Sequence, residues 1–294
     1  MDFVAVDVET ANPDSASICQ IGLAKYEQGV LSQEWKSYVD PEDYFDEFNV
    51  SIHGIDESMV EGAPKFHSLA ETLYGFMDSA IVVCHMSFDR VAISRAAQRY
   101  GVRVPAGTWL DTAMVARRAW KEFARSGYGL RDVCSALGYD FMHHDALEDA
   151  KASAYILLAA MKQTGLDLEG WLARVRQRLD PNAKRSVQAA PDISREGNRE
   201  GPLYGEVLVF TGALETPRRE AADLAAAIGC QVAEGVTKKT TMLVVGDQDA
   251  RKLAGYEKSA KQGKAEQLIA DGIAIHILAE SDFNQLVRMY GENS

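Results

Sequence analysis

The stretch FVAVDVE at residues 3–9 decides the fold of the first part of the chain. Its apolar residues predict a buried central strand, which two acids, Asp7 and Glu9, interrupt. Side chains alternate between the two faces of a strand, so these two acids point to the same face. Like charges on a buried face repel each other unless water, a partner or a metal ion compensates them. Taken alone, the pair fits a metal site and an exposed strand end equally well.

Two more acids stand near the starts of predicted helices. Asp89 lies in CHMSFDR at 84–90, directly after an apolar run. An acid there commonly caps a helix or compensates its dipole. Asp149 lies in HHDALEDA at 143–150, within the first turns of the strongest helical pattern of the chain. A solvated helix face is the simplest interpretation of Asp149, so neither acid alone indicates a site.

His144 precedes Asp149 by five residues. Within one continuous helix that offset separates two side chains by about 140°, at 100° per residue. Both side chains reach one site only if His144 lies on the loop before the helix, and we expect it there. We expect the neighbouring His143 to be a loop residue without a role in the site.

The pattern around these motifs predicts strands and helices that alternate over the first 180 residues. Strands are expected at 3–9, in two segments of 16–39 joined by a turn at Gln28-Gly29, at 80–84 and at 107–111. Helices are expected at 64–77, with Pro64 in the first turn, and at 88–100, 112–120, 129–137 and 145–162. This order predicts an α/β fold, with a mixed sheet flanked by helices.

Three motifs in this order, DVET, HMSFD and HDALEDA, resemble those of the DEDD exonuclease superfamily, in its DnaQ-like branch that carries a histidine (DEDDh). YGLRDVC at 128–134 is similar to the helix before that histidine. The resemblance covers about residues 1–165. It implies a ribonuclease H-like fold and hydrolysis of nucleic acid from 3′ ends to nucleoside 5′-monophosphates.

The resemblance also implies the roles of five residues. Asp7, Glu9, Asp89 and Asp149 would hold two Mg²⁺ or Mn²⁺ ions, with Asp7 as the bridge, and His144 would take the proton from the attacking water. Two such ions stabilise the charge on the attacking and leaving oxygens of a phosphodiester. Hard oxygen ligands favour magnesium or manganese over zinc.

A change of texture divides the chain. Residues 181–202 contain three prolines and two glycines and show no apolar periodicity, which is typical of an exposed linker. We therefore expect an exonuclease-like domain at 1–180, with its core at about 1–165, and a second domain at 203–294.

The second domain shows short strands separated by helices, expected at 217–228, 256–271 and 279–290. FTG, the pair Arg219-Glu220 and the strand TMLVVG resemble a BRCT domain of the bacterial NAD-dependent DNA ligase type. That resemblance implies a small α/β domain and a phosphate pocket at Thr211, Gly212 and Lys261. A simple turn with a solvated lysine explains the same three residues equally well.

Composition limits the functional classes. With 31 basic and 43 acidic side chains the net charge is −12, which argues against a broad surface that coats duplex DNA but permits an enzyme that holds one short end. The four cysteines form no CxxC pair, so neither a zinc site nor a disulfide framework is expected. The chain has no long apolar run and no signal-peptide pattern at its start, so we expect a cytoplasmic protein without a membrane partner.

These observations predict a metal-dependent 3′→5′ exonuclease that acts on DNA in preference to RNA, in DNA repair or replication proofreading. The BRCT-like domain would tether it to a phosphate-bearing DNA end or a phosphoprotein. Met86 stands where the family usually has asparagine and cannot make that amide's hydrogen bonds. The alternatives are an exonuclease for RNA or short oligonucleotides, and a catalytically inert binding adaptor.

Overall fold

The computed structural model describes residues 2–124, 127–177, 179, 193–246 and 259–291. Contacts between Cα atoms divide the chain into two compact units, Met1–Val175 and Arg176–Ser294. Residues 181–192 of the expected linker lie outside the described residues. The remainder of that segment contacts the second unit, because Arg195 and Val232 exchange two backbone hydrogen bonds of 3.1 and 2.9 Å.

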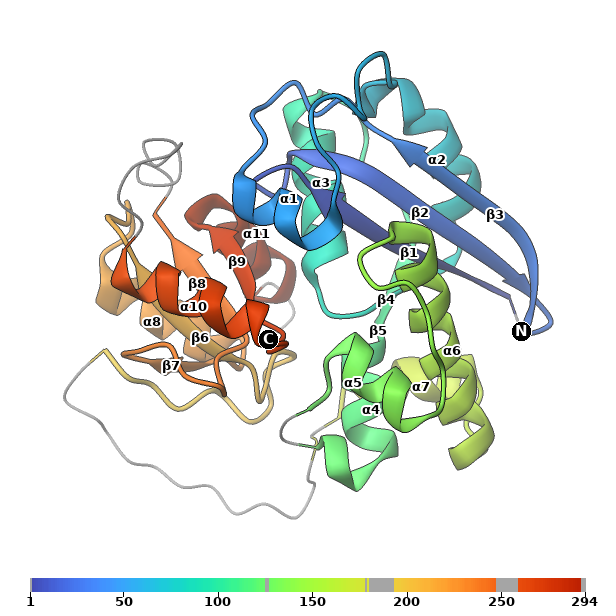
Figure 1. Cartoon of the computed structure of the whole chain (residues 1–294). Helices are drawn as coiled ribbons and strands as arrows, with labels where there is room; N and C mark the ends of the chain where they lie inside the picture. The colour runs from blue at the N-terminus through green and yellow to red at the C-terminus, as the bar shows by residue number, and fades with distance from the viewer. Residues whose placement is uncertain (1, 125–126, 178, 180–192, 247–258, 292–294) are drawn as a thin grey trace. The chain divides into compact units, whose positions relative to one another are not determined.

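A five-stranded mixed sheet forms the centre of the first unit (Figure 1). Its order is β3-β2-β1-β4-β5, with β1 antiparallel to β2 and parallel to β4. The strands are β1 (Phe3–Thr10), β2 (Ile18–Glu27), β3 (Val30–Tyr38), β4 (Ile81–Cys84) and β5 (Thr108–Asp111). Gln28 and Gly29 both have positive φ, as a tight hairpin between β2 and β3 requires. The predicted α/β class, with a mixed sheet flanked by helices, is confirmed.

Helices cover both faces of this sheet (Figure 1). They are α1 (Glu47–His53), the 3₁₀ helix η1 (Phe66–Leu69), α2 (Ala70–Met77), α3 (Phe88–Arg99), α4 (Thr112–Ala119), the 3₁₀ helix η2 (Lys121–Phe123), α5 (Leu130–Ala136), α6 (Ala146–Thr164) and α7 (Leu168–Val175). The expected helix at 64–77 is wrong at its start: η1 precedes α2, and Pro64 lies outside both. Helices α1 and α7 were not predicted from the sequence.

The two faces of β1 are packed differently. Val4, Val6 and Val8 belong to the apolar cluster that includes α2 and α3. Phe3 and Ala5 belong to the cluster that includes α4, α6 and α7. By strand alternation, positions 7 and 9 continue the row of Phe3 and Ala5, toward α6. The face of β1 that points toward α6 is thus apolar at Phe3 and Ala5 and acidic at Asp7 and Glu9.

Gly22 on β2 lets α6 approach the sheet. It pairs with Asp7 on β1, and an added Cβ would lie 2.3 Å from the backbone carbon of Ala146. Gly22→Ala is expected to lower the free energy of unfolding by about 1–3 kcal/mol, because the first turn of α6 must move away from the sheet. Urea unfolding of the full chain measures the difference.

Gly75 provides the matched control. It is exposed within α2, and no atom lies within 4 Å of an added Cβ. Gly75→Ala should raise the free energy of unfolding by about 0.5–1 kcal/mol, since alanine loses less conformational freedom than glycine in a helix. Equal stability of Gly22→Ala and the wild type would contradict the close approach of α6.

The second unit contains a four-stranded parallel sheet of order β7-β6-β8-β9. Its elements are β6 (Val207–Thr211), α8 (Arg218–Ala227), β7 (Gln231–Ala233), β8 (Met242–Val245), α10 (Ala260–Ala270), β9 (His276–Ala279) and α11 (Glu280–Gly291). The start of the helix expected at 256–271 falls on residues 256–258, outside the described residues. Over the described parts of both units, every helix is too short or too polar to cross a membrane.

Candidate active site

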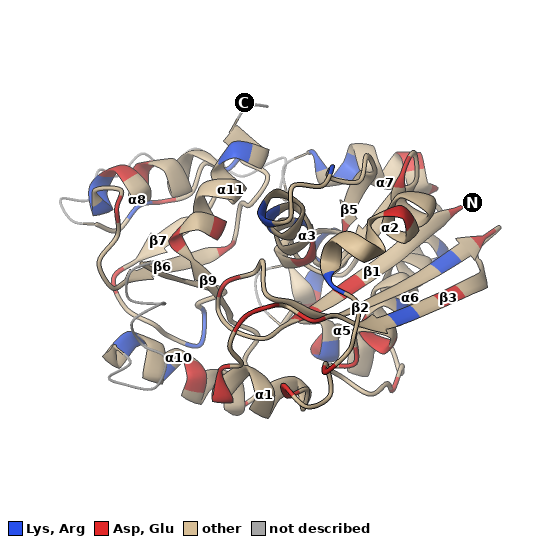
Figure 2. Ribbon diagram, turned by 90° about the horizontal axis from the view of Figure 1, so that it is seen from above, with Lys and Arg blue, Asp and Glu red and all other residues tan. Residues whose placement is uncertain are grey.

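Acidic side chains from β1 and α6 meet at one point of the first unit. Asp7, Glu9 and Asp149 each offer a carboxylate oxygen, and these atoms all lie within 4.8 Å of one another. Figure 2 colours the Asp and Glu residues of the ribbon red. Asp7 and Glu9 are partly buried, and Asp149 is buried with 3% exposure. Asp7 and Glu9 face the same side because side chains alternate along β1. Asp149 reaches them because α6 packs on β1.

Side-chain hydrogen bonds anchor the first turn of α6. Asp145 caps the helix and accepts from the backbone N–H of Leu147 at 3.1 Å. Gln20 on β2 accepts from the backbone N–H of Ala146 at 2.9 Å. Lys36 on β3 forms an ion pair with Asp145 at 2.7 Å. Asp149, one turn into the helix, is therefore held at a fixed height above β1.

Asp89 approaches the same strand from α3. It lies in the first turn of that helix, is 2% exposed, and its Oδ1 accepts from the backbone N–H of Val8 at 3.0 Å. Asp89 is not part of the group of three oxygens within 4.8 Å. Its charge nevertheless acts on Asp7, so the four predicted carboxylates occupy one region of the unit.

The four carboxylates resist ionisation. Burial, followed by the charge of Asp89, raises the pKa of Asp7 well above its ordinary value. Burial, followed by the charge of Asp149, raises the pKa of Glu9 in the same way. Burial also raises the pKa of Asp149, against the opposing hydrogen bond of His143. A bound cation would favour the ionised forms of all these groups.

His144 lies on the loop before α6, as its spacing from Asp149 requires. Its side chain is 37% exposed, and its Nδ1 lies 4.0 Å from Oε1 of Glu9. Its φ of 67° is left-handed, which is uncommon outside glycine, although histidine is among the residues enriched there. This conformation lets its backbone N–H donate to Oδ2 of Asp149 at 3.1 Å.

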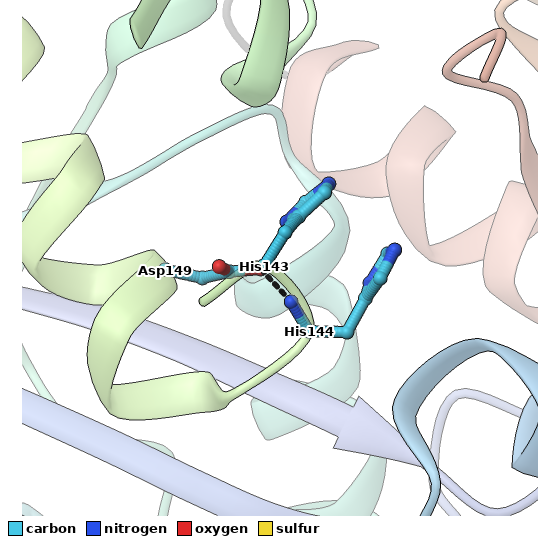
Figure 3. Close-up of side chains that lie close together, drawn as sticks. All are labelled: His143, His144 and Asp149. Atoms are coloured by element: carbon cyan, nitrogen blue, oxygen red, sulfur yellow. Dashed lines mark hydrogen bonds and ion pairs between the residues drawn. The ribbon is translucent and has the colours of Figure 1, made fainter. Parts of the chain in front are cut away.

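His143 lies on the loop before α6, as the sequence analysis expects, and in addition contacts Asp149. Nδ1 of His143 lies 2.9 Å from Oδ2 of Asp149, and its ring stacks on that of His144 with centroids 3.8 Å apart (Figure 3). Nothing in the spacing of His143 distinguishes it from a loop residue, because its contact depends on the left-handed turn at His144. The adjacent pair of histidines was the one available signal.

Met86 stands in the loop between β4 and α3 with a φ of 71°. Its side chain is 7% exposed and belongs to an apolar cluster with Ala113 and Tyr128. Its backbone N–H donates to Oδ1 of Asp111 at 2.8 Å. The side chain of Met86 thus packs in this apolar cluster, and its backbone hydrogen bond to Asp111 fixes the turn that leads to Asp89.

The pKa of Asp89 gives a pH-dependent prediction for the metal-free protein. Burial raises this pKa to about 8. Between the ordinary value near 4 and this value, the native state holds a proton that the unfolded state has released, so rising pH destabilises the native state. In chelator, the stability of Asp89→Asn relative to the wild type should increase from pH 5.5 to pH 8. Urea unfolding at both pH values measures it.

Asp78 serves as the control carboxylate. A hydrogen bond from Arg103 lowers its pKa to about 2. Both its folded and its unfolded pKa lie below pH 5.5, so the effect of Asp78→Asn should not change between pH 5.5 and pH 8. If the stability difference between Asp89→Asn and the wild type is also the same at pH 5.5 and pH 8, the pKa of Asp89 is not raised.

The three predicted residues of the second unit lie together at the carboxyl end of β6. Thr211 Oγ1 lies 2.8 Å from Ser259 Oγ, and Gly212 follows with a φ of 74°. Lys261 donates to the backbone oxygen of Phe210 at 3.0 Å. Burial, followed by the charge of Arg218, lowers the pKa of Lys261. Two cations and two hydroxyls thus adjoin a turn.

A comparison with known protein families defines the class of the first unit. The model of the RNase_T exonuclease family matches residues 4–157, slightly more than half of the chain. The chain therefore belongs to the RNase_T exonuclease family, and its first unit is a nuclease domain.

Individual proteins are similar to part of the chain. The PolC-type DNA polymerase III of Caldanaerobacter subterraneus subsp. tengcongensis is 29% identical over 166 residues, which cover 55% of this chain and 12% of that protein. The 3′-5′ exonuclease DinG of Bacillus subtilis is 28% identical over 187 residues, covering 62% and 19%. The chain thus spans less than a fifth of the length of these relatives. Exonuclease X in complex with 5′ overhanging duplex DNA matches at 21% identity and a TM-score of 0.48, covering 58% of this chain and 98% of that one.

Proposed function

We propose that the first unit is a metal-dependent 3′→5′ exonuclease that releases nucleoside 5′-monophosphates from 3′ ends, acting on DNA in preference to RNA. The observation that carries this proposal is the meeting of Asp7, Glu9 and Asp149 within 4.8 Å, beside His144. The names of the relatives, a PolC-type DNA polymerase III and a 3′-5′ exonuclease, favour replication proofreading or DNA repair as the setting.

The donor set fits Mg²⁺ or Mn²⁺. Oδ1 of Asp149 is buried, and no donor within the described residues hydrogen-bonds to it. An ionised oxygen in that state is costly unless a cation binds it. Asp7, Glu9, Asp89 and Asp149 offer oxygen ligands only, which hard divalent ions prefer. When bound, two such ions would stabilise the negative charge that builds up on the reacting phosphodiester.

The residues of the chain supply the remaining chemistry. Asp7 groups with Glu9 and Asp149, and the charge of Asp89 also acts on it, so Asp7 would help to hold both ions. His144 is partly exposed beside Glu9, so its imidazole can reach a water and remove a proton from it. The turn at Met86 sets the position of Asp89 against β1.

End-labelled oligonucleotides test this function. The full chain should shorten 5′-labelled single-stranded DNA stepwise and release labelled mononucleotide at once from 3′-labelled DNA, with Mg²⁺ or Mn²⁺ but not with EDTA. Faster turnover of the matching RNA would reverse the stated substrate preference. Tight Mn²⁺ binding without turnover of any DNA or RNA end would instead identify an inert adaptor.

For the second unit we propose a BRCT-type module that binds the phosphate of a DNA end or of a phosphoprotein. Support comes from its parallel sheet of order β7-β6-β8-β9 and from the cations at the end of β6. A hydroxyl, a left-handed glycine turn and an ammonium are suitable donors for a phosphate. The pocket would include Thr211, Gly212 and Lys261, with Arg218 beside them.

Lys261→Ala should weaken binding of a 5′-phosphorylated duplex end about tenfold, because one charged donor is lost from a partly buried site. Lys264→Ala is the matched control, since this lysine is exposed on the same helix. Fluorescence anisotropy over a salt series measures both, and nuclease turnover of short oligonucleotides should stay unchanged. Equal affinities of the two variants would remove the phosphate pocket.

A further inference from the structure

His143 contacts both the acid and the imidazole of the proposed site (Figure 3). Its Nδ1 lies 2.9 Å from Oδ2 of Asp149. Its ring is stacked on that of His144, with an interplanar angle of 18°. It also makes an edge contact with the ring of Phe141, with centroids 5.5 Å apart. Its side chain is 29% exposed, so the ring lies at the rim of the site.

We propose that His143 is a positioning residue: it orients the carboxylate of Asp149 toward the cations and the ring of His144 toward the water. This inference rests on the proposed function, and it assigns a role to a residue outside the four carboxylates and His144. Two separate contacts carry it, one polar and one between rings.

The polar contact selects which oxygen of Asp149 remains available. When Asp149 is ionised, as a cation ligand must be, its carboxylate only accepts hydrogen bonds, so Nδ1 of His143 then carries the proton of this bond. Oδ2 accepts a second bond from the backbone N–H of His144 at 3.1 Å. Oδ1 is buried and accepts none within the described residues. The two donors therefore hold Oδ2 in place and leave Oδ1 available as the ligand atom. Mutation of a residue that hydrogen-bonds to a metal ligand commonly lowers metal affinity by about 10- to 100-fold.

The ring contact limits the motion of His144. That side chain is 37% exposed and projects from a loop with left-handed backbone. The ring of His143 stacks on one of its faces, with centroids 3.8 Å apart, and limits its rotation on that side. The rings of Phe141 and His143 make an edge contact with centroids 5.5 Å apart, so His143 itself packs against a second ring. A general base works only when its nitrogen is within reach of the proton it removes.

Two substitutions separate these contacts. His143→Asn keeps a side-chain N–H near the position of Nδ1 and removes the ring. His143→Phe keeps a ring against His144 and removes the donor. Isothermal titration with MnCl₂ on the full chain measures the metal site without turnover, and turnover of a 5′-labelled oligonucleotide at saturating Mn²⁺ measures the base.

We expect His143→Phe to raise the Mn²⁺ dissociation constant about tenfold, whereas His143→Asn leaves it near the wild-type value. At saturating Mn²⁺, His143→Asn should show the larger loss of turnover, about tenfold, because His144 is less well oriented. His67→Phe, on the exposed surface of η1, is the control and should change neither quantity.

Wild-type Mn²⁺ affinity in His143→Phe would overturn the polar contact, and equal losses in both variants without a change in affinity would reduce His143 to a structural role. If Mn²⁺ binding weakens in His143→Phe while the wild type turns over no substrate, the proposed function fails and the orientation of Asp149 by His143 stands. The titration and the turnover assay thus separate the two conclusions.

Discussion

Asp7→Asn is expected to reduce exonuclease turnover about a thousandfold or more, the largest effect of any single substitution in this protein. One carboxylate oxygen of Asp7 lies within 4.8 Å of those of Glu9 and Asp149, and the charges of Asp89, Asp149 and Glu9 all raise the pKa of Asp7. Asparagine keeps the shape but removes the charge, and its amide hydrogens repel a cation. Asp7 would help to hold both ions, so its loss would remove the charge stabilisation that they supply to the phosphodiester, rather than weaken one contact.

The same substitution should stabilise the metal-free protein. Burial and like charges raise the pKa of Asp7, so ionising it at pH 8 costs folding free energy that asparagine avoids. Thermal unfolding in EDTA should therefore show a higher midpoint for Asp7→Asn than for the wild type, and Mg²⁺ should raise the midpoint of the wild type alone. A chain that is inactive yet more stable cannot owe its inactivity to misfolding. Wild-type turnover in Asp7→Asn would refute the site.

The alternation of apolar and acidic residues on β1 was sufficient to predict that strand and the common direction of Asp7 and Glu9. Such a local pattern is readable because one residue in two faces α6. The mixed sheet was predictable because turns or helices separate its strands, although β3 is mostly polar and exposed.

Helices α1 and α7 were missed for different reasons. No residue of α1 is buried, so it has no apolar stripe and only its cap, Asp46, marks it. In α7, Leu168, Trp171, Leu172 and Val175 are buried at the spacing of one helix face. That apolar spacing is present in the sequence, but the segment lies shortly before the expected linker and was not assigned to a helix.

The other features that could not be predicted depend on contacts between residues far apart in the sequence or on an unusual backbone turn. Gly22 reads as an ordinary strand glycine, and only the fold shows the backbone of Ala146 against it. Gln20 caps a helix that begins 126 residues later in the chain. His143 acquires its contact with Asp149 from the turn at His144. The roles of the five site residues and of Lys261 remain predictions that the experiments above test.

His144→Asn is expected to lower turnover by about 10²–10⁴ while Mn²⁺ binding persists, because it removes a general base and no carboxylate. Asparagine is the appropriate replacement, since His144 has a φ of 67° and asparagine tolerates the left-handed region better than alanine. The backbone N–H that donates to Asp149 is also retained. Isothermal titration with MnCl₂ and single-turnover hydrolysis measure the two quantities separately.

The pH dependence of the residual activity distinguishes a lost base from a displaced one. Without an imidazole, hydroxide must replace the base, so turnover of His144→Asn should rise steadily with pH. His67→Asn, at an exposed position of η1, should follow the wild type at every pH. If His144→Asn instead loses Mn²⁺ affinity as much as turnover, the imidazole is a metal ligand rather than the base. The 4.0 Å between its Nδ1 and Oε1 of Glu9 would then be a spacing of two ligands around one ion.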